Sequence, residues 1–237
     1  LLMFAILGAL ILRGLAPEMY EQREDETWQT WWGRAFVVGS VTAPFFLGMF
    51  TANWLLGATT IVTLPGVVVG LAVVALTVVD GVAYLRLKTR GDLRDGLRTD
   101  GYRALAAYLV LVVLTLGYVY LAAPFLRSAL LSPLVLGLVL ATLVFAAAYA
   151  LATRRDRYYL AFGASAGMVF ALAGVVAGLM YPNIDRAGGL TVDSAVVSTL
   201  PLNLVSIGAA LLLPLIFVYF GILYSAFSGP AEAEEAY

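Results

Sequence analysis

The sequence predicts an all-α fold in which several helices cross a membrane, and three observations carry this prediction. Of the 237 residues, 62% are hydrophobic and only 12% are charged, whereas about 25% are charged in an ordinary soluble domain. The mean hydropathy is +0.94. Long apolar runs recur along the chain, and most reach the roughly 20 residues that a helix needs to cross a hydrocarbon core. A soluble fold could not bury so much apolar surface.

The first apolar run covers residues 1–15 and is too short for a complete span. No basic segment precedes it and no small-residue cleavage site follows it, so it does not have the pattern of a signal peptide. Because the chain begins inside this run, we expect a truncated first helix with further sequence upstream.

Six complete spans follow, and each is bounded by charged residues, prolines, glycines or aromatic residues. Pro44 and Pro214 lie inside spans and should bend their helices. We therefore expect one transmembrane domain over residues 1–228, followed by a disordered acidic tail over residues 229–237. The six spans run near residues 35–56, 65–87, 104–126, 133–152, 160–181 and 201–227.

The positive charges predict the orientation of the chain. Twelve of the fourteen Lys and Arg residues fall in or beside the loops after the first, third and fifth spans. The loops on the other side carry only Arg127 and Arg186. Since cytoplasmic loops are rich in Lys and Arg, the first set of loops should be cytoplasmic.

One span carries a packing pattern. Two GxxxG motifs in residues 160–181 place four glycines on one helical face, where two backbones can approach closely. A cofactor or lipid could approach the same face, but we interpret it as a helix contact. The four are Gly163, Gly167, Gly174 and Gly178.

Ionisable residues within or near a membrane are the first candidates for function. Arg13 and Glu18 lie near the inner boundary of the first span. Asp80 lies about one turn before the basic loop after the third span and should need a partner, such as Arg86 or a water-filled cavity. Asp193, near the start of the last span, is a further boundary candidate. Snorkelling for Arg13 and an ordinary interfacial ion pair for Asp80 are the alternatives.

Several function classes are excluded by residue types that are absent. The chain has no histidine and no cysteine, so it cannot ligate a haem through two histidines or bind a metal through thiolates. We predict no metal site and no catalytic residue in this chain. Its one lysine, Lys88, lies in a predicted loop, which excludes a retinal Schiff base. The net charge of -1 gives no reason to expect a nucleic-acid partner.

Three segments resemble subunit II of cytochrome bd-type quinol oxidases. They are LILRGLAPE with WQTWWGRAFVVGSVTAPFFLG (residues 10–18 and 28–48), DGVAYLRLKTRGDLRDGLR (80–98), and YPNI with LTVDSA (181–184 and 190–195). Their order and spacing cover nearly the whole chain. The family has two additional helices at its start, with DGFDLG-like and GNEVW-like segments that this sequence lacks, so the intact protein should have eight to nine spans. Family members often have histidine or glutamine at the position of Asp80.

The resemblance implies a role in an aerobic respiratory chain, in the cell membrane of a prokaryote. The complex would oxidise quinol and reduce dioxygen at haems b and d, which a larger subunit I would hold. This chain would scaffold subunit I as a heterodimer, with small accessory subunits and a structural quinone or lipid as further partners. Arg13 and Glu18 match family residues near a proposed route for cytoplasmic protons, where an arginine beside a carboxylate can organise water.

Two other functions remain open at this point. A multi-pass permease or channel would work without a haem partner and would purify as a colourless oligomer. A purely structural subunit would hold its partner without any role in proton uptake, and it would tolerate substitution of both Arg13 and Glu18.

Overall fold

The structure is a computed structural model that describes residues 1–185, 188–196 and 198–226. Seven of its helices are long and apolar enough to cross a membrane, which confirms the predicted all-α polytopic bundle. They are α1 (Leu2–Glu21), α2 (Glu26–Leu56), α3 (Leu64–Lys88), α4 (Asp92–Ala122), α6 (Pro133–Arg154), α7 (Tyr158–Met180) and α9 (Thr199–Ala226).

Three helices are longer than the sequence predicted. Helix α1 continues through Pro17 to Glu21, so the first span, expected to be partial, is a 20-residue helix. Helix α2 begins at Glu26, where the side chain of Asp25 caps the backbone N–H of Trp28. Residues 92–103, expected to lie largely in a loop, form the first turns of α4, where Asp92 and Asp95 complement the positive end of the helix dipole.

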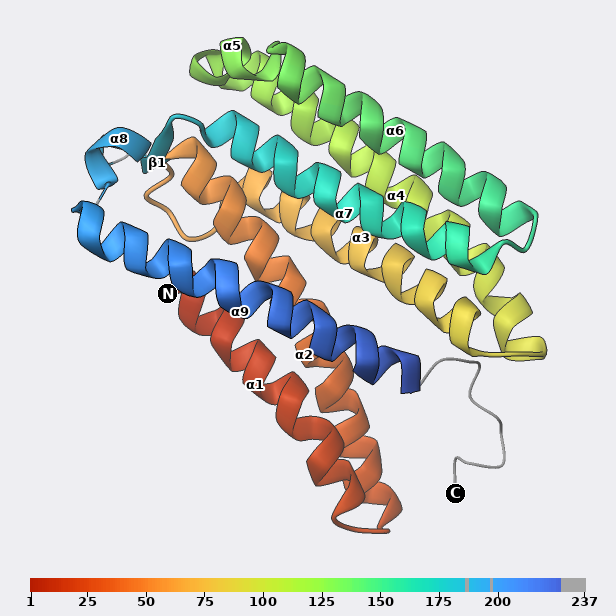
Figure 1. The fold of residues 1–237 in the computed structure, drawn as a ribbon. Helices are drawn as coiled ribbons and strands as arrows, with labels where there is room; N and C mark the ends of the chain where they lie inside the picture. The colour runs from red at the N-terminus through yellow and green to blue at the C-terminus, as the bar shows by residue number, and fades with distance from the viewer. Residues whose placement is uncertain (186–187, 197, 227–237) are drawn as a thin grey trace.

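Four helices form the centre of the bundle. Helices α3, α4, α6 and α7 enclose a core that includes Leu76, Val79, Tyr108, Tyr149 and Met168. Helix α2 packs beside α3, and α1 packs against α2 as the outermost pair. Figure 1 shows these helices side by side, with the α1–α2 hairpin extending away from α4 and α6.

Short elements connect the long helices at the end of the bundle opposite the basic loops. A 3-10 helix, η1 (Pro124–Leu126), and α5 (Arg127–Leu130) join α4 to α6. Strands β1 (Asn183–Asp185) and β2 (Leu190–Thr191) form an antiparallel pair after α7. Helix α8 (Val192–Ala195) follows, and a capping box formed by Thr191 and Ser194 caps its N-terminus.

Helix α9 has few contacts with the rest of the described chain. None of its described residues is buried, and it crosses one side of the molecule in Figure 1. Pro214 lies inside it, as Pro44 lies inside α2. The acidic tail predicted over residues 229–237 lies outside the described residues.

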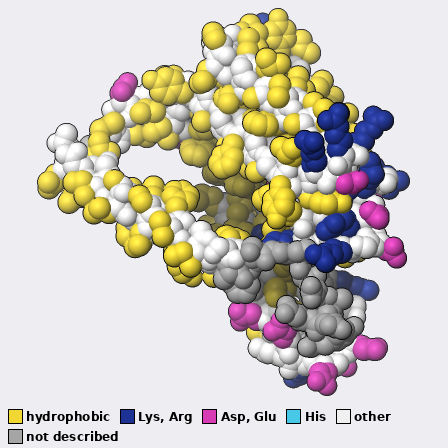
Figure 2. All heavy atoms as spheres, turned by 45° about the vertical axis from the view of Figure 1, so that its right-hand side comes forward, with side chains coloured by type: hydrophobic (Ala, Val, Ile, Leu, Met, Phe, Trp, Pro, Cys, Tyr) yellow, Lys and Arg dark blue, Asp and Glu magenta, His cyan; other side chains and the backbone are white. Residues whose placement is uncertain are grey.

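One end of the molecule carries most of the charge. Figure 2 shows Lys and Arg side chains gathered there, with acidic side chains between them, while the rest of the visible surface is mainly apolar. This end contains the turns after α3 and α6. The turns after α3 and α6, which the sequence predicts to be cytoplasmic, therefore lie at the same end of the molecule.

Candidate functional site

Arg13 and Glu18 lie on α1, and both are exposed. Five residues apart, they point to different sides of the helix, since each residue advances by about 100°. Within the described chain, the structure records no ion pair between them. The backbone at Arg13 is nevertheless held tightly, because a Cβ on Gly39 of α2 would lie 2.8 Å from the Arg13 nitrogen.

The turn that follows Glu18 is fixed by a tryptophan. The indole N–H of Trp28 donates to the carbonyl oxygen of Met19, and the Arg23 guanidinium lies 4.8 Å from the centre of the Trp28 ring. Trp32 packs against Trp28 one turn later. These contacts tie the end of α1 to the start of α2 and hold the backbone beside Glu18.

Asp80 has a partner that differs from the one expected. The Ser165 hydroxyl of α7 lies 2.5 Å from Asp80 Oδ1 and 2.8 Å from the carbonyl oxygen of Phe162. Ser165 is fully buried, whereas Asp80 is half-buried. Asp80 therefore links α3 to α7, and the expected partner Arg86 is used elsewhere.

Arg86 forms an ion pair with the loop between α6 and α7. Its guanidinium donates to Asp156 at 3.1 Å and to the backbone carbonyl of Arg94 at 3.3 Å. The Arg86 side chain is 3% exposed and that of Asp156 is 51% exposed. Arg86 and Arg94 also lie against the ring of Tyr158. This cluster closes the basic end of the four-helix core.

Two buried hydroxyls lie between Asp80 and this cluster. Tyr149 and Thr153 are one turn apart on α6 and almost fully buried. Neither hydroxyl makes a hydrogen bond of good geometry in the described part of the chain, although the two lie close enough to interact with each other. Tyr149 is also within electrostatic range of Asp80 and Arg86.

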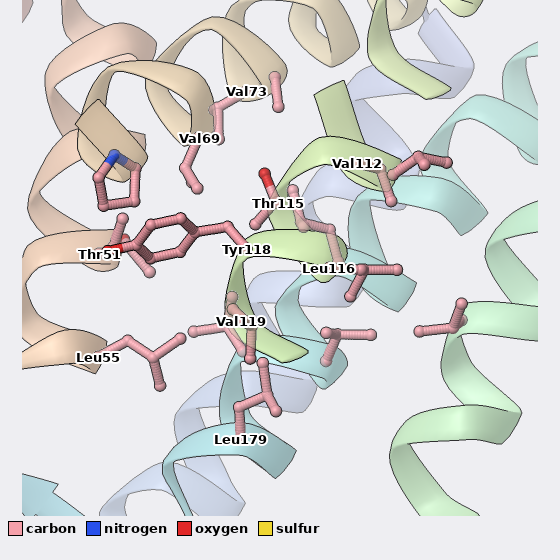
Figure 3. Close-up of a pocket in the computed structure, with 18 of the residues that line it drawn as sticks. Thr51, Leu55, Val69, Val73, Val112, Thr115, Leu116, Tyr118, Val119 and Leu179 are labelled. Atoms are coloured by element: carbon pink, nitrogen blue, oxygen red, sulfur yellow. The ribbon is translucent and has the colours of Figure 1, made fainter. Parts of the chain in front are cut away.

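An apolar cavity of about 220 Å³ lies farther from the basic end, between α2, α3, α4, α6 and α7. In Figure 3 the ring of Tyr118 points from α4 toward Thr51 of α2, and the aliphatic side chains of Leu55, Val69 and Val119 surround it. The lining of the cavity is almost entirely apolar. Such a space suits a hydrocarbon chain better than a polar ligand.

The four glycines of α7 differ in their surroundings. A Cβ on Gly167 would lie 2.8 Å from the Phe145 ring of α6, and Gly174 and Gly178 also face α6 side chains. Gly163 is exposed and has no atom within 4 Å of such a Cβ. Asp193 lies in α8, where its side chain is exposed.

Sequence reasoning missed the closest backbone contacts and the partners of the buried charges. A Cβ on Gly48 would lie 2.8 Å from both Gly70 Cα and the Val69 carbonyl oxygen, so α2 and α3 touch there. Neither Asp156 nor Ser165 was among the residues that the sequence predicted to be functional. The spacing of polar residues on one helix could have marked Ser165, but its partner lies 85 positions away.

No group of three or more His, Cys, Asp and Glu side chains that could hold a metal ion occurs among the described residues. The comparisons with known proteins point to one family. The family model described as cytochrome bd terminal oxidase subunit II matches residues 1–227. A search of curated proteins returned no match to this chain.

Proposed function

The chain belongs to the subunit II family of cytochrome bd terminal oxidases, and on this premise we propose that it scaffolds a haem-bearing subunit I and takes part in proton uptake. The family makes it a membrane subunit of an oxidase complex, so a permease or channel is not favoured. The identity of the partner and the role in proton uptake are the proposed parts.

The residue types of this chain support the proposal that the partner subunit holds the haems. Without histidine or cysteine, it lacks the usual axial ligands of haem. The haems b and d of such an oxidase would then be held by subunit I. They would supply the oxygen chemistry there, while this chain contributes packing surface. Small accessory subunits would join the same assembly.

The surface that would receive subunit I is apolar and large. Helix α9 has no buried residue among those described, and α1 is covered on little more than the side that faces α2. Leu211 and Phe217 of α9 are 71% and 70% exposed. In a membrane both lipid and another protein can cover such a surface. Because this chain is a subunit of a complex, part of the surface must contact another protein.

Arg13 and Glu18 are the residues that we propose for proton uptake. Both are exposed on α1, near the boundary that the sequence predicts to be cytoplasmic, and Gly39 and Trp28 fix the backbone around them. A carboxylate held by a rigid backbone at the membrane surface can accept a proton and pass it to a neighbouring subunit. The Arg13 guanidinium would orient water on its own side of α1.

The test is Glu18→Gln in the full-length protein within its complex, with Glu21→Gln as the matched control on the same helix. We expect Glu18→Gln to slow oxygen-reducing turnover several-fold while the haem content stays unchanged. Glu21→Gln should leave both unchanged. If turnover of Glu18→Gln equals that of the wild type at every pH, Glu18 is not on the route. If substitution of Arg13 is tolerated as well, the purely structural function replaces this proposal.

The apolar cavity supports a structural quinone or lipid as a further component. A hydrocarbon tail would lie among the side chains of α2, α4 and α7 that line it, and the ring of Tyr118 points toward Thr51 there (Figure 3). Enlarging Val119 to Trp should exclude the tail. Extraction and mass spectrometry of the bound lipids would then show one component fewer than in the wild type.

A further inference from the structure

The Ser165 hydroxyl lies close to two oxygen atoms that can both accept a hydrogen bond. Ser165 Oγ lies within hydrogen-bond distance of two acceptors, Asp80 Oδ1 at 2.5 Å and the Phe162 carbonyl oxygen at 2.8 Å. A serine hydroxyl has only one proton to donate. It can therefore form a strong hydrogen bond to one of these oxygens at a time.

Two arrangements of protons satisfy the same heavy-atom positions. If Asp80 is ionised, Ser165 donates to its carboxylate. If Asp80 is protonated, the carboxyl O–H donates to Ser165 Oγ, and the Ser165 hydroxyl turns to donate to the Phe162 carbonyl. The change between them requires only a rotation of the hydroxyl. Asp80 can therefore gain or lose a proton while α3 and α7 stay in place.

Asp80 lies beside the apolar core, next to the buried Val79 and one turn from Ala83 on α3. Arg86 lies six residues farther along α3, about 9 Å, and its guanidinium is bound to Asp156. Tyr149 on α6 lies within electrostatic range of Asp80, and the Ser165 hydroxyl on α7 contacts it. Tyr84, one turn along α3, packs against the ring of Phe162.

A connection to the cytoplasmic end runs along α6. Tyr149 is 1% exposed and lies within electrostatic range of both Asp80 and Arg86. Thr153 follows one turn closer to the cytoplasm, and neither hydroxyl is well paired in the described chain. Ordered water can satisfy buried polar groups of this kind. Beyond them lies Asp156, whose side chain is half exposed at the surface.

We propose that Asp80 is a proton-binding site, that Ser165 keeps a hydrogen bond to it in both protonation states, and that Tyr149 and Thr153 connect it to the cytoplasm. On release, the proton passes from the carboxyl oxygen to water, and the Ser165 O–H turns from the Phe162 carbonyl to the carboxylate. The site is independent of Glu18 and holds whether or not that residue carries protons.

The experiment is infrared difference spectroscopy of the purified full-length complex during a pH titration, comparing wild type with Asp80→Asn. We expect the wild type to show the C=O stretch of a protonated carboxyl that Asp80→Asn lacks. The band should disappear as the pH rises and should shift in D2O. Asp193→Asn is the matched control, since Asp193 is exposed and its removal should leave this band unchanged.

Two further variants test the partners. Ser165→Ala should shift the frequency of the band, because the hydrogen bond is lost, and Tyr149→Phe should slow its exchange in D2O several-fold. The proposal is overturned if Asp80 gives only a carboxylate band at every pH, or if its carboxyl band neither titrates nor exchanges. Should Asp80→Asn fail to assemble, a carboxyl band in the wild type that Ser165→Ala leaves unmoved overturns it equally.

Discussion

The ion pair of Arg86 and Asp156 depends on a backbone conformation that few residues adopt. Asp156 has a φ of 52°, in the left-handed region that Asn and Asp tolerate better than most other residues. Its carboxylate accepts from the buried guanidinium of Arg86. The position therefore selects both a short polar side chain and a negative charge.

Asp156→Ala should destabilise the protein more than Asp156→Asn. Alanine loses the acceptor for a buried guanidinium, which costs about 1 kcal/mol or more, and it adds about 1 kcal/mol of backbone strain. Asparagine keeps the conformation and an acceptor oxygen. Thermal unfolding of the purified complex in detergent should rank the midpoints as wild type, Asn, then Ala. Equal midpoints for the two variants would show that neither the lost acceptor nor the left-handed backbone carries a cost here.

Single residues were the hardest level to predict from the sequence. Asp80 was correctly chosen as a residue that needs a partner, because its position in a span is visible from hydropathy. The predicted partner, Arg86, was wrong. Arg86 is near Asp80 in the sequence, whereas Ser165 comes close only because α7 packs against α3. The structure fixes Arg13 and Glu18 on α1 but does not pair them.

At the level of elements, glycines set how closely α2 approaches its neighbours. Gly39 meets the backbone of α1 near Arg13, and Gly48 meets that of α3 at Gly70. Backbone atoms cannot move aside as a flexible side chain can. Without a side chain at these positions, neighbouring helices gain the close contact that stabilises association within a membrane.

Gly48→Ala should separate α2 from α3, because the new Cβ would lie 2.8 Å from the Gly70 Cα. Such overpacking costs about 1–3 kcal/mol. Gly163→Ala is the control: it has no atom within 4 Å of the added carbon, and it removes a flexible glycine from a helix. Thermal unfolding of both variants in detergent is the measurement. A Gly48→Ala protein as stable as Gly163→Ala would mean that α2 shifts freely.

The helices themselves were predictable, and their ends were less so. Long apolar runs identified the seven long helices of the described residues, because the bilayer imposes a minimum length on each span. The extra turns of α2 and α4 carry charged residues and extend beyond the apolar runs, so hydropathy did not reveal them. The short strands after α7 follow no strong pattern in the sequence.

For the whole molecule, charge asymmetry orients the bundle. The basic end in Figure 2 contains the turn between α6 and α7, while the turn between α2 and α3 lies at the other end of the bundle. The rule that loops rich in Lys and Arg stay in the cytoplasm then predicts the direction in which each helix crosses the membrane. The natural absence of cysteine makes this orientation directly measurable.

Single cysteines at Thr59 and Arg155 should react from opposite sides of the membrane. Both positions are exposed, and they lie in the turns after α2 and α6. In intact cells, a thiol reagent that cannot cross the membrane should label Thr59→Cys and spare Arg155→Cys. In inverted vesicles the pattern should reverse. Labelling of Arg155→Cys in intact cells would show that the orientation is the opposite one.

The most direct test of the assembly is purification of the full-length tagged protein from its native membranes. An oxidised-minus-reduced absorption spectrum and identification of the co-purifying chains are the two readouts. We expect a larger, histidine-containing membrane protein and the bands of haems b and d to arrive with it. A stable protein that arrives alone and colourless would contradict its proposed role as the scaffold of a haem-bearing subunit.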